Sequence, residues 1–183
     1  MSTKTKINEE SLIKTIQRKG TECEEMQELI QVYHEDIETL ARHYQNNEVF
    51  TSHLITAAKE AMKRAVLKYP FNHKVQFEDY VFWWIEQAIL KRLLHSETNA
   101  HKLLFCEKMK SLYESAAREN NTTAECLVVF GNVDYDSCPI VQEYQEKGYK
   151  LSDANAFGVS AETDSDIEIR GEVLTFTKID SNK

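Results

Sequence analysis

Residues 77–93 of the chain, FEDYVFWWIEQAILKRL, contain both of its tryptophans, which are adjacent at Trp83 and Trp84. Neighbouring residues on an α-helix point about 100° apart, so the two indoles cannot face the same way. A helical wheel of this stretch places small and aliphatic residues on one side, namely Val81, Ile85, Ala88 and Ile89. That side is typical of a face that packs into a protein core.

The opposite side of the same helix combines aromatic and polar residues. We call it the aromatic stripe, and its members are Tyr80, Trp83, Trp84, Gln87 and Lys91. One interpretation is that the tryptophans pack between helices, with Gln87 and Lys91 at the rim of the contact. The other is that the stripe binds single-stranded nucleic acid, because bases stack on aromatic rings, amides pair with base edges and ammonium groups meet phosphates.

Helical periodicity extends on both sides of this segment and predicts a mainly α-helical protein. Apolar residues at steps of three and four indicate helices near 8–20, 26–44 and 54–69, the last ending at Pro70. We expect a helical bundle domain over residues 8–96, followed by a smaller, partly irregular acidic part over 97–183. That part is expected to contain a helix near 101–119, then a loop-rich segment with a short strand near 172–178. The stretch TAECLVVFG could be a helix or a strand.

Charge is distributed unevenly along the chain, which has a net charge of −8. Residues 51–95 carry seven basic and four acidic side chains, whereas residues 120–183 carry five basic and twelve acidic ones. The tryptophan segment is therefore the basic part of an acidic protein, and contact with phosphate is expected there.

Several classes of protein are not indicated by the sequence. It has no apolar run near 18 residues, so we expect no membrane contact. The four cysteines form no Cys-x-x-Cys pair, which favours free thiols and a cytoplasmic location. The six histidines do not form a metal-ligand set, and no glycine-rich phosphate loop or nucleophile motif is present. We therefore expect no metal, no cofactor and no enzymatic activity.

The tryptophan segment resembles the promoter-melting helix of bacterial sigma factors of the sigma-70 class, whose pattern is close to F-S-T-Y-A-x-W-W-I-R-Q-A-I-x-R. The identical residues are Phe77, Tyr80, Trp83, Trp84, Ile85, Gln87, Ala88 and Ile89, and Lys91 matches as a basic residue. The likeness continues upstream without gaps, where Ala65, Val66 and Lys68 match the family's K-A-V-x-K. It covers about residues 10–95, the helical domain called region 2.

The resemblance implies a function in transcription initiation. Region 2 docks on a coiled coil of the RNA polymerase clamp and captures the non-template strand of the −10 promoter element, with one base flipped out of the stack. By that likeness, Tyr80 would stack the flipped base, Trp83 and Trp84 would contact the upstream fork, and Gln87 would face the last base pairs. The remaining DNA-contacting positions implied by the resemblance are Tyr69, Phe77, His73, Lys74, Lys91 and Arg92.

The positions that dock on polymerase depart from the family's D-L-I-Q-E-G motif. His53 stands in place of the acid, Leu54 is kept, and Thr56 and Ala57 replace the glutamine and glutamate. On the DNA side, Asp79 replaces a threonine and Glu86 replaces a basic residue, which should weaken binding to phosphate. The expected polymerase contact is therefore altered from the family's usual one.

Two functions follow from these observations. The first is a divergent sigma-like initiation factor that binds the polymerase core and melts a −10-like element through the aromatic stripe. The second is a sigma-derived interaction module that regulates polymerase or another sigma factor and does not initiate transcription alone. In the second, a further protein or the acidic C-terminal part would mask the basic face. An exposed aromatic stripe would favour the first function, and a covered one the second.

Overall fold

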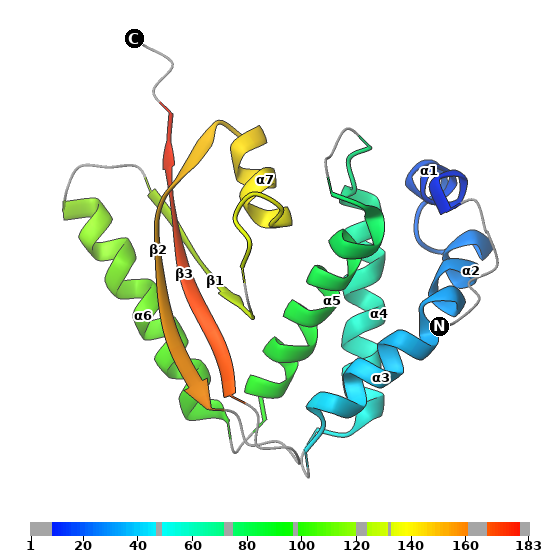
Figure 1. Ribbon diagram of the computed structural model, residues 1–183, viewed down its shortest axis with the longest axis horizontal. Helices are drawn as coiled ribbons and strands as arrows, with labels where there is room; N and C mark the ends of the chain where they lie inside the picture. Colours follow the sequence, from blue (N-terminus) through cyan, green and yellow to red (C-terminus); the bar gives the residue numbers. More distant parts are fainter. Residues whose placement is uncertain are drawn as a thin grey trace.

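The computed structural model describes residues 9–46, 49–71, 75–96, 99–119, 124–131, 133–160 and 168–179. Within these residues the chain forms seven helices and a three-stranded sheet, so it is mostly helical. The elements are α1 (Glu9–Lys19), α2 (Glu24–Val32), α3 (His34–Tyr44), α4 (Thr51–Lys68), α5 (Phe77–Leu94), α6 (Ala100–Glu119), β1 (Ala124–Phe130), α7 (Pro139–Glu146), β2 (Tyr149–Ser160) and β3 (Glu168–Lys178). Helices α1–α5 form one half of the molecule, and the remaining elements form the other half (Figure 1).

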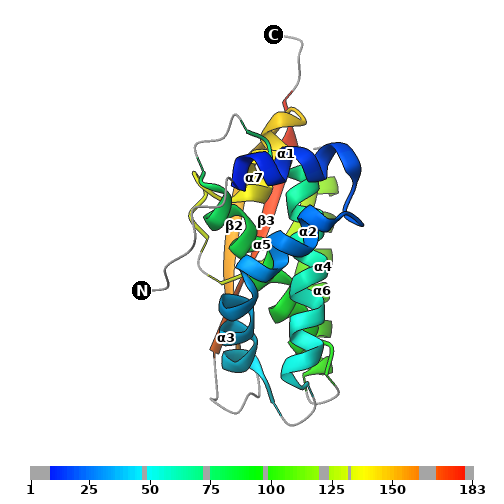
Figure 2. The same cartoon turned by 90° about the vertical axis from the view of Figure 1, so that its right-hand side faces the viewer.

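The helical half is built around the pair α4 and α5. The predicted core face of α5 is confirmed for Val81, Ile85 and Ile89, which are fully buried. Helix α4 ends at Lys68, and Tyr69 has extended backbone. The cause is Pro70, because a residue that precedes a proline disfavours the helical conformation. Helix α1 crosses α4 and ends at Gly20, which adopts a φ of 92° that suits glycine (Figure 2).

The long helix predicted over 26–44 is wrong in one respect, because the chain bends at Tyr33 and forms α2 and α3 instead. Tyr33 leaves helical geometry, with φ −95° and ψ 2°. Its ring is completely buried, and its hydroxyl donates a hydrogen bond to Glu9 at 3.0 Å. Since α3 begins immediately after the bend, the spacing of apolar residues continues and does not reveal it.

The C-terminal half is more regular than the sequence predicts. Helix α6 lies where a helix is expected, and β3 contains the segment 172–178 for which a strand is favoured. However, TAECLVVFG contributes the strand β1, and the expected loop-rich segment contains α7 and β2. The sheet has the order β1-β3-β2 with both pairs antiparallel. Because β2 is an edge strand with many polar side chains, it lacks the alternation that would predict a strand.

Helix α5 joins the two halves. Beyond its face toward α4, it buries Leu90, Leu93 and Leu94 in a second cluster with Phe130 and Cys106. Helix α6 covers the sheet on the side away from α5 (Figure 1). Among the described residues, no helix is both long enough and apolar enough to cross a membrane.

Candidate nucleic-acid interface

The aromatic stripe of α5 is buried or half-buried except at Lys91, and Tyr80 is its most buried member. Only 3% of Tyr80 is exposed. Its ring contacts Tyr69 in an edge arrangement with centroids 5.2 Å apart, and Tyr69 contacts Phe77 in turn at 5.1 Å. Burial raises the pKa of the Tyr80 hydroxyl to about 12. A base could not stack on this ring in the form that the structure describes.

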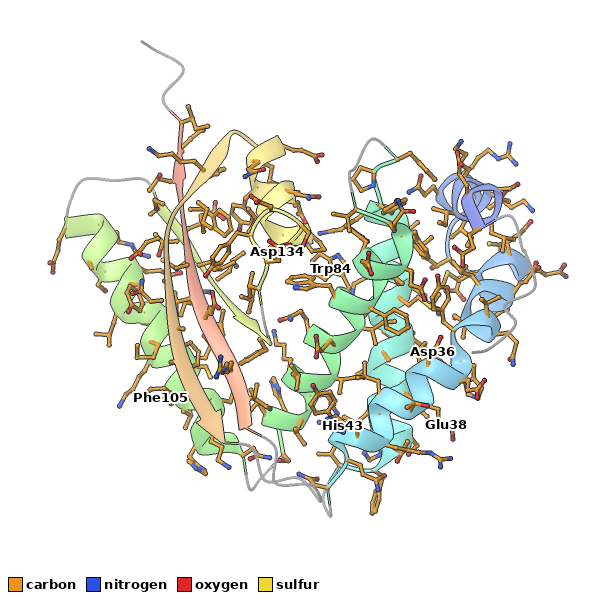
Figure 3. All side chains as sticks on the ribbon, in the orientation of Figure 1. Asp36, Glu38, His43, Trp84, Phe105 and Asp134 are labelled. Atoms are coloured by element: carbon orange, nitrogen blue, oxygen red, sulfur yellow. The ribbon has the colours of Figure 1, made fainter. Side chains whose placement is uncertain are left out.

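The two tryptophans contact different buried clusters, and both lie where the two halves of the molecule meet. Their rings meet edge to face, with centroids 5.0 Å apart. Trp84 packs on the core of the helical half, while Trp83 packs on a cluster of the C-terminal half that includes Val129 and Phe176. Trp83 Nε1 is buried and has no hydrogen-bond partner among the described residues. Trp84 points from α5 toward the C-terminal elements (Figure 3).

Gln87 makes two hydrogen bonds with the backbone of one residue of β1. Its Nε2 donates to the carbonyl oxygen of Phe130 at 2.6 Å, and its Oε1 accepts from the backbone N–H of Phe130 at 2.8 Å. Strand β1 lies at an edge of the sheet and has one neighbouring strand. Every second residue of an edge strand therefore has a backbone N–H and carbonyl that form no hydrogen bond within the sheet. The side-chain amide of Gln87 satisfies one such pair of groups.

An ion pair links α4 to α7 beside the stripe. Lys68 Nζ lies 3.2 Å from a carboxylate oxygen of Glu143, and it also lies 5.4 Å from the centre of a Trp84 ring. Glu143 contacts Lys147 as well, at 2.7 Å. Partial burial would raise the pKa of Glu143, but the hydrogen bonds from Lys147 and Lys68 outweigh it, and the pKa is lowered. The carboxylate is therefore ionised at neutral pH and attracts the positive charge of Lys68.

Glu86, an acid where the family has a basic residue, also belongs to this contact. It accepts a hydrogen bond from the Tyr44 hydroxyl at 3.1 Å. Burial raises the pKa of Tyr44 to about 12, and the Glu86 charge adds to the shift. Gly131, directly after β1, adopts a φ of 86°, and Glu86 lies against it. This acid therefore contacts both halves of the molecule and is not a free surface charge. We call the interface between α1–α5 and the C-terminal elements the seam.

Two of the four predicted phosphate-binding positions belong to the described residues. Lys91 and Arg92, in the last turn of α5, are exposed. His73 and Lys74 lie outside the described residues. The structure therefore brings Tyr69, Phe77, Tyr80 and the tryptophans together, and it leaves Lys91 and Arg92 in solvent.

The predicted polymerase-docking positions are divided between core and surface. Leu54 is fully buried in the helical half, so it is not available to a partner. His53 and Thr56 are exposed, and Ala57 is half-buried. The Thr56 hydroxyl donates to the carbonyl of Ser52 within α4, at 2.9 Å. His53 contacts the ring of Phe50, which is 62% exposed, and these two side chains offer a small aromatic surface at the start of α4.

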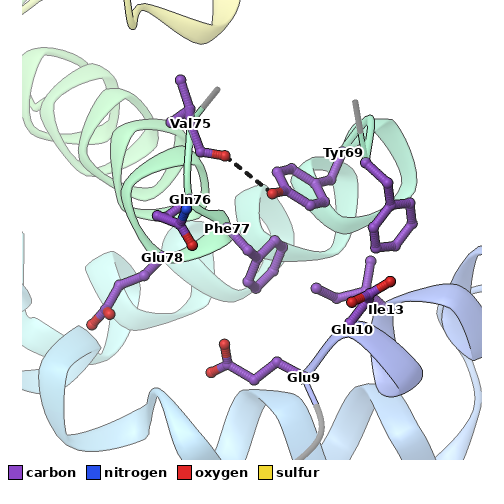
Figure 4. Close-up of a pocket in the computed structure, with 9 residues that line it drawn as sticks. Glu9, Glu10, Ile13, Tyr69, Val75, Gln76, Phe77 and Glu78 are labelled. Carbon is purple, nitrogen blue, oxygen red and sulfur yellow. Dashed lines mark hydrogen bonds between the residues drawn. The ribbon is translucent and has the colours of Figure 1, made fainter. Parts of the chain in front are cut away.

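Two cavities of about 420 Å³ flank the N-terminal end of α5. The first is lined by Tyr69, Val75, Phe77 and the three acids Glu9, Glu10 and Glu78, and Tyr69 donates to the Val75 carbonyl at 3.1 Å on its wall (Figure 4). Three carboxylates at one opening disfavour a phosphate there. No group of three metal-binding side chains occurs in the described ranges.

The second cavity lies on the seam between the halves. It is lined by Val75, Gln76, Asp79, Trp83, Asp134, Asp136, Ser137, Cys138 and Pro139. Asp134 accepts a hydrogen bond from the Ser137 hydroxyl at 2.8 Å, which orders the turn that leads into α7. The packing around Trp83 is therefore incomplete on this side.

Three residues at the seam could not be assigned to the site from the sequence pattern: Phe130, Glu143 and Gly131. Glu143 belongs to α7, which the sequence does not predict. Phe130 and Gly131 belong to the stretch TAECLVVFG, which the sequence leaves open between helix and strand, and Phe130 acts through its backbone. The opposite net charges of segments 51–95 and 120–183 are the one sequence signal that relates the two surfaces.

Comparison with known proteins does not assign the chain to a class. No family model matches it, and neither a curated protein nor a solved structure shows significant similarity to it.

Proposed function

We propose that the chain is a sigma-derived regulator of transcription. In this proposal it binds RNA polymerase or another sigma factor through its helical half, and it does not initiate transcription alone. The observation that carries the proposal is the covered state of the aromatic stripe, above all the double hydrogen bond between Gln87 and Phe130. A promoter-melting helix needs these side chains free to meet DNA.

The likeness of residues 77–93 to the promoter-melting helix supports a role in transcription. His53, one of the positions at which the resemblance implies contact with the polymerase clamp, is exposed at the start of α4, next to the exposed ring of Phe50. The altered docking residues favour a modified partner surface rather than the usual one. The proposed role requires a cytoplasmic location, which is part of the proposal.

A second candidate is a sigma-like initiation factor that melts a −10-like element after the C-terminal half has moved. Lys91 and Arg92 favour it, because both are exposed at the end of the stripe and could meet promoter phosphates. In this candidate the non-template strand would replace the C-terminal half on α5.

The two candidates are separated by an assay with the purified full chain and core RNA polymerase. Capture of the core, and of a sigma factor in a parallel sample, is measured first. His53→Ala is the test variant, and Ser52→Ala, its neighbour on the same exposed turn, is the control. Transcription from a promoter with a pre-melted −10 region is measured next. We expect the wild-type chain to capture the core, His53→Ala to weaken capture, and no transcript to form.

Two results would contradict this expectation. If neither polymerase nor a sigma factor is captured, the regulator proposal fails. If the chain and the core alone produce a transcript, the second candidate replaces it, and Lys91→Glu combined with Arg92→Glu should then abolish the transcript. Lys108→Glu combined with Arg118→Glu, on exposed positions of α6, provides the matched change in charge.

A further inference from the structure

We infer that the C-terminal half is an internal competitor of single-stranded nucleic acid. It covers Trp83 and Gln87 of the aromatic stripe, and Lys68 beside Trp84, with groups that match those of a nucleotide strand. A strand would bind this part of α5 only by displacing it. The inference rests on the proposed function, because it takes the stripe to be a nucleic-acid site whose covering prevents initiation.

The contact at Gln87 has the donor and acceptor pattern of a base edge. A glutamine amide pairs with adenine by donating to N7 and accepting from the N6 amino group. Phe130 offers Gln87 the same pair of groups, since its carbonyl oxygen accepts at 2.6 Å and its N–H donates at 2.8 Å. The backbone of one β1 residue thus takes the position that an adenine could take.

The contact at Lys68 has the charge pattern of a phosphate. Glu143 places a carboxylate 3.2 Å from Lys68 Nζ, beside the Trp84 ring. Burial is the main cause of the raised pKa of Tyr80, and the negative charges of Glu143 and Glu146 contribute to it. Helix α7 therefore places the Glu143 carboxylate beside Lys68 and Trp84, where a phosphate of a bound strand could pair with Lys68.

The contacts at the α7 end of the seam are weaker than those at the C-terminal end of α5, so the α7 end can open first. At the C-terminal end of α5, Leu90, Leu93 and Leu94 anchor the two halves through a buried apolar cluster. Toward the N-terminal end the link is formed by Trp83 and an ion pair in which Lys68 is 52% exposed. The Gln87 pair lies between the two ends, because its partner Phe130 belongs to the leucine cluster. The cavity of about 420 Å³ beside Trp83 further reduces the packing there.

The test uses Glu143→Lys in the full chain. This change turns attraction to Lys68 into repulsion without altering a residue of the stripe. The control is Glu107→Lys, which makes the same change in charge at an exposed position of α6. Both tryptophans of the chain lie at the seam, so their fluorescence reports opening without any ligand.

The binding probe is a single-stranded oligodeoxynucleotide with adenines spaced in a run of thymines. When a site is available only part of the time, the apparent affinity falls in proportion to the available fraction. We expect Glu143→Lys to shift tryptophan emission to the red and to tighten binding about five-fold relative to Glu107→Lys. Replacing adenine by 7-deazaadenine, which lacks N7, should remove part of that gain.

Each other result counts against the inference. Red-shifted emission with no tighter binding than Glu107→Lys would make the covering purely structural. Unchanged emission and unchanged binding would mean that α7 does not control access. Equal affinity for adenine and 7-deazaadenine would overturn the base-edge match. Polymerase capture, measured in parallel, tests the proposed function separately, because its loss does not alter the oligonucleotide result.

Discussion

Gln87 shows how one side chain can fit two different partners. An amide offers a donor and an acceptor in one plane, and this arrangement pairs equally well with a base edge and with the backbone of an edge strand. In this structure the partner is Phe130. The identity of the residue predicts a polar partner of this kind, but not whether it is nucleic acid or protein.

Substituting Gln87 by leucine should destabilise the protein. The change leaves the N–H and carbonyl of Phe130 unpaired at a partly buried seam, which costs about 1–3 kcal/mol of unfolding free energy. Urea denaturation measures this cost, with Gln31→Leu on the exposed face of α2 as the matched control. A cost for Gln87→Leu no larger than that of Gln31→Leu would mean that solvent pairs the Phe130 groups just as well.

Tyr80 should make the stability of the fold depend on pH in the alkaline range. Its pKa is raised from 10.0 to about 12, mainly by burial, so the folded state favours the protonated hydroxyl. The contribution is complete below pH 10 and is lost as the pH rises toward 12, by about 2–3 kcal/mol. Denaturation of wild type and Tyr80→Phe across this window should give a smaller decline for the variant. Identical declines would show that Tyr80 is not the group responsible.

At the scale of elements, α5 explains which predictions could be made from the sequence. Its core face was predictable because Val81, Ile85 and Ile89 recur at helical spacing and pack on one neighbour. Its other sides were harder to assign, because α5 lies between two layers and most of its residues are buried or half-buried. Leu90, Leu93 and Leu94 are spaced by three and four residues and mark a second apolar face, but the wheel does not reveal that this face packs in a cluster with Phe130.

The C-terminal elements could be predicted only in part, for a related reason. Strand β3 is the central strand, and its buried residues Val173, Leu174 and Phe176 make it recognisable. The edge strand β2 and the short helix α7 depend on contacts with residues far away in the chain, which periodicity does not record. Since α7 and β1 form the cover of the aromatic stripe, the state of the candidate site could not be predicted either.

At the scale of the whole molecule, α5 makes the two halves interdependent. It supplies residues to the core of the helical half, to the leucine cluster and, through Trp83, to the core beside the sheet. If the packing of one of these clusters is lost, the shared helix should destabilise the other clusters as well. The fold should therefore unfold as one unit, even though the seam can open locally at α7.

Urea unfolding followed with two probes tests this interdependence. Far-ultraviolet circular dichroism reports the helices, and tryptophan fluorescence reports the seam, so coincident transitions are expected for the wild type. Leu93→Ala should lower the free energy of unfolding by about 2–5 kcal/mol and move both transitions together, because Leu93 is fully buried in the shared cluster. Leu67→Ala, at a leucine that is 47% exposed, should change it by at most about 0.5 kcal/mol. If Leu93→Ala moves the fluorescence transition ahead of the dichroism transition, the C-terminal half separates before the helices melt, and the molecule consists of two units joined at α5 rather than one.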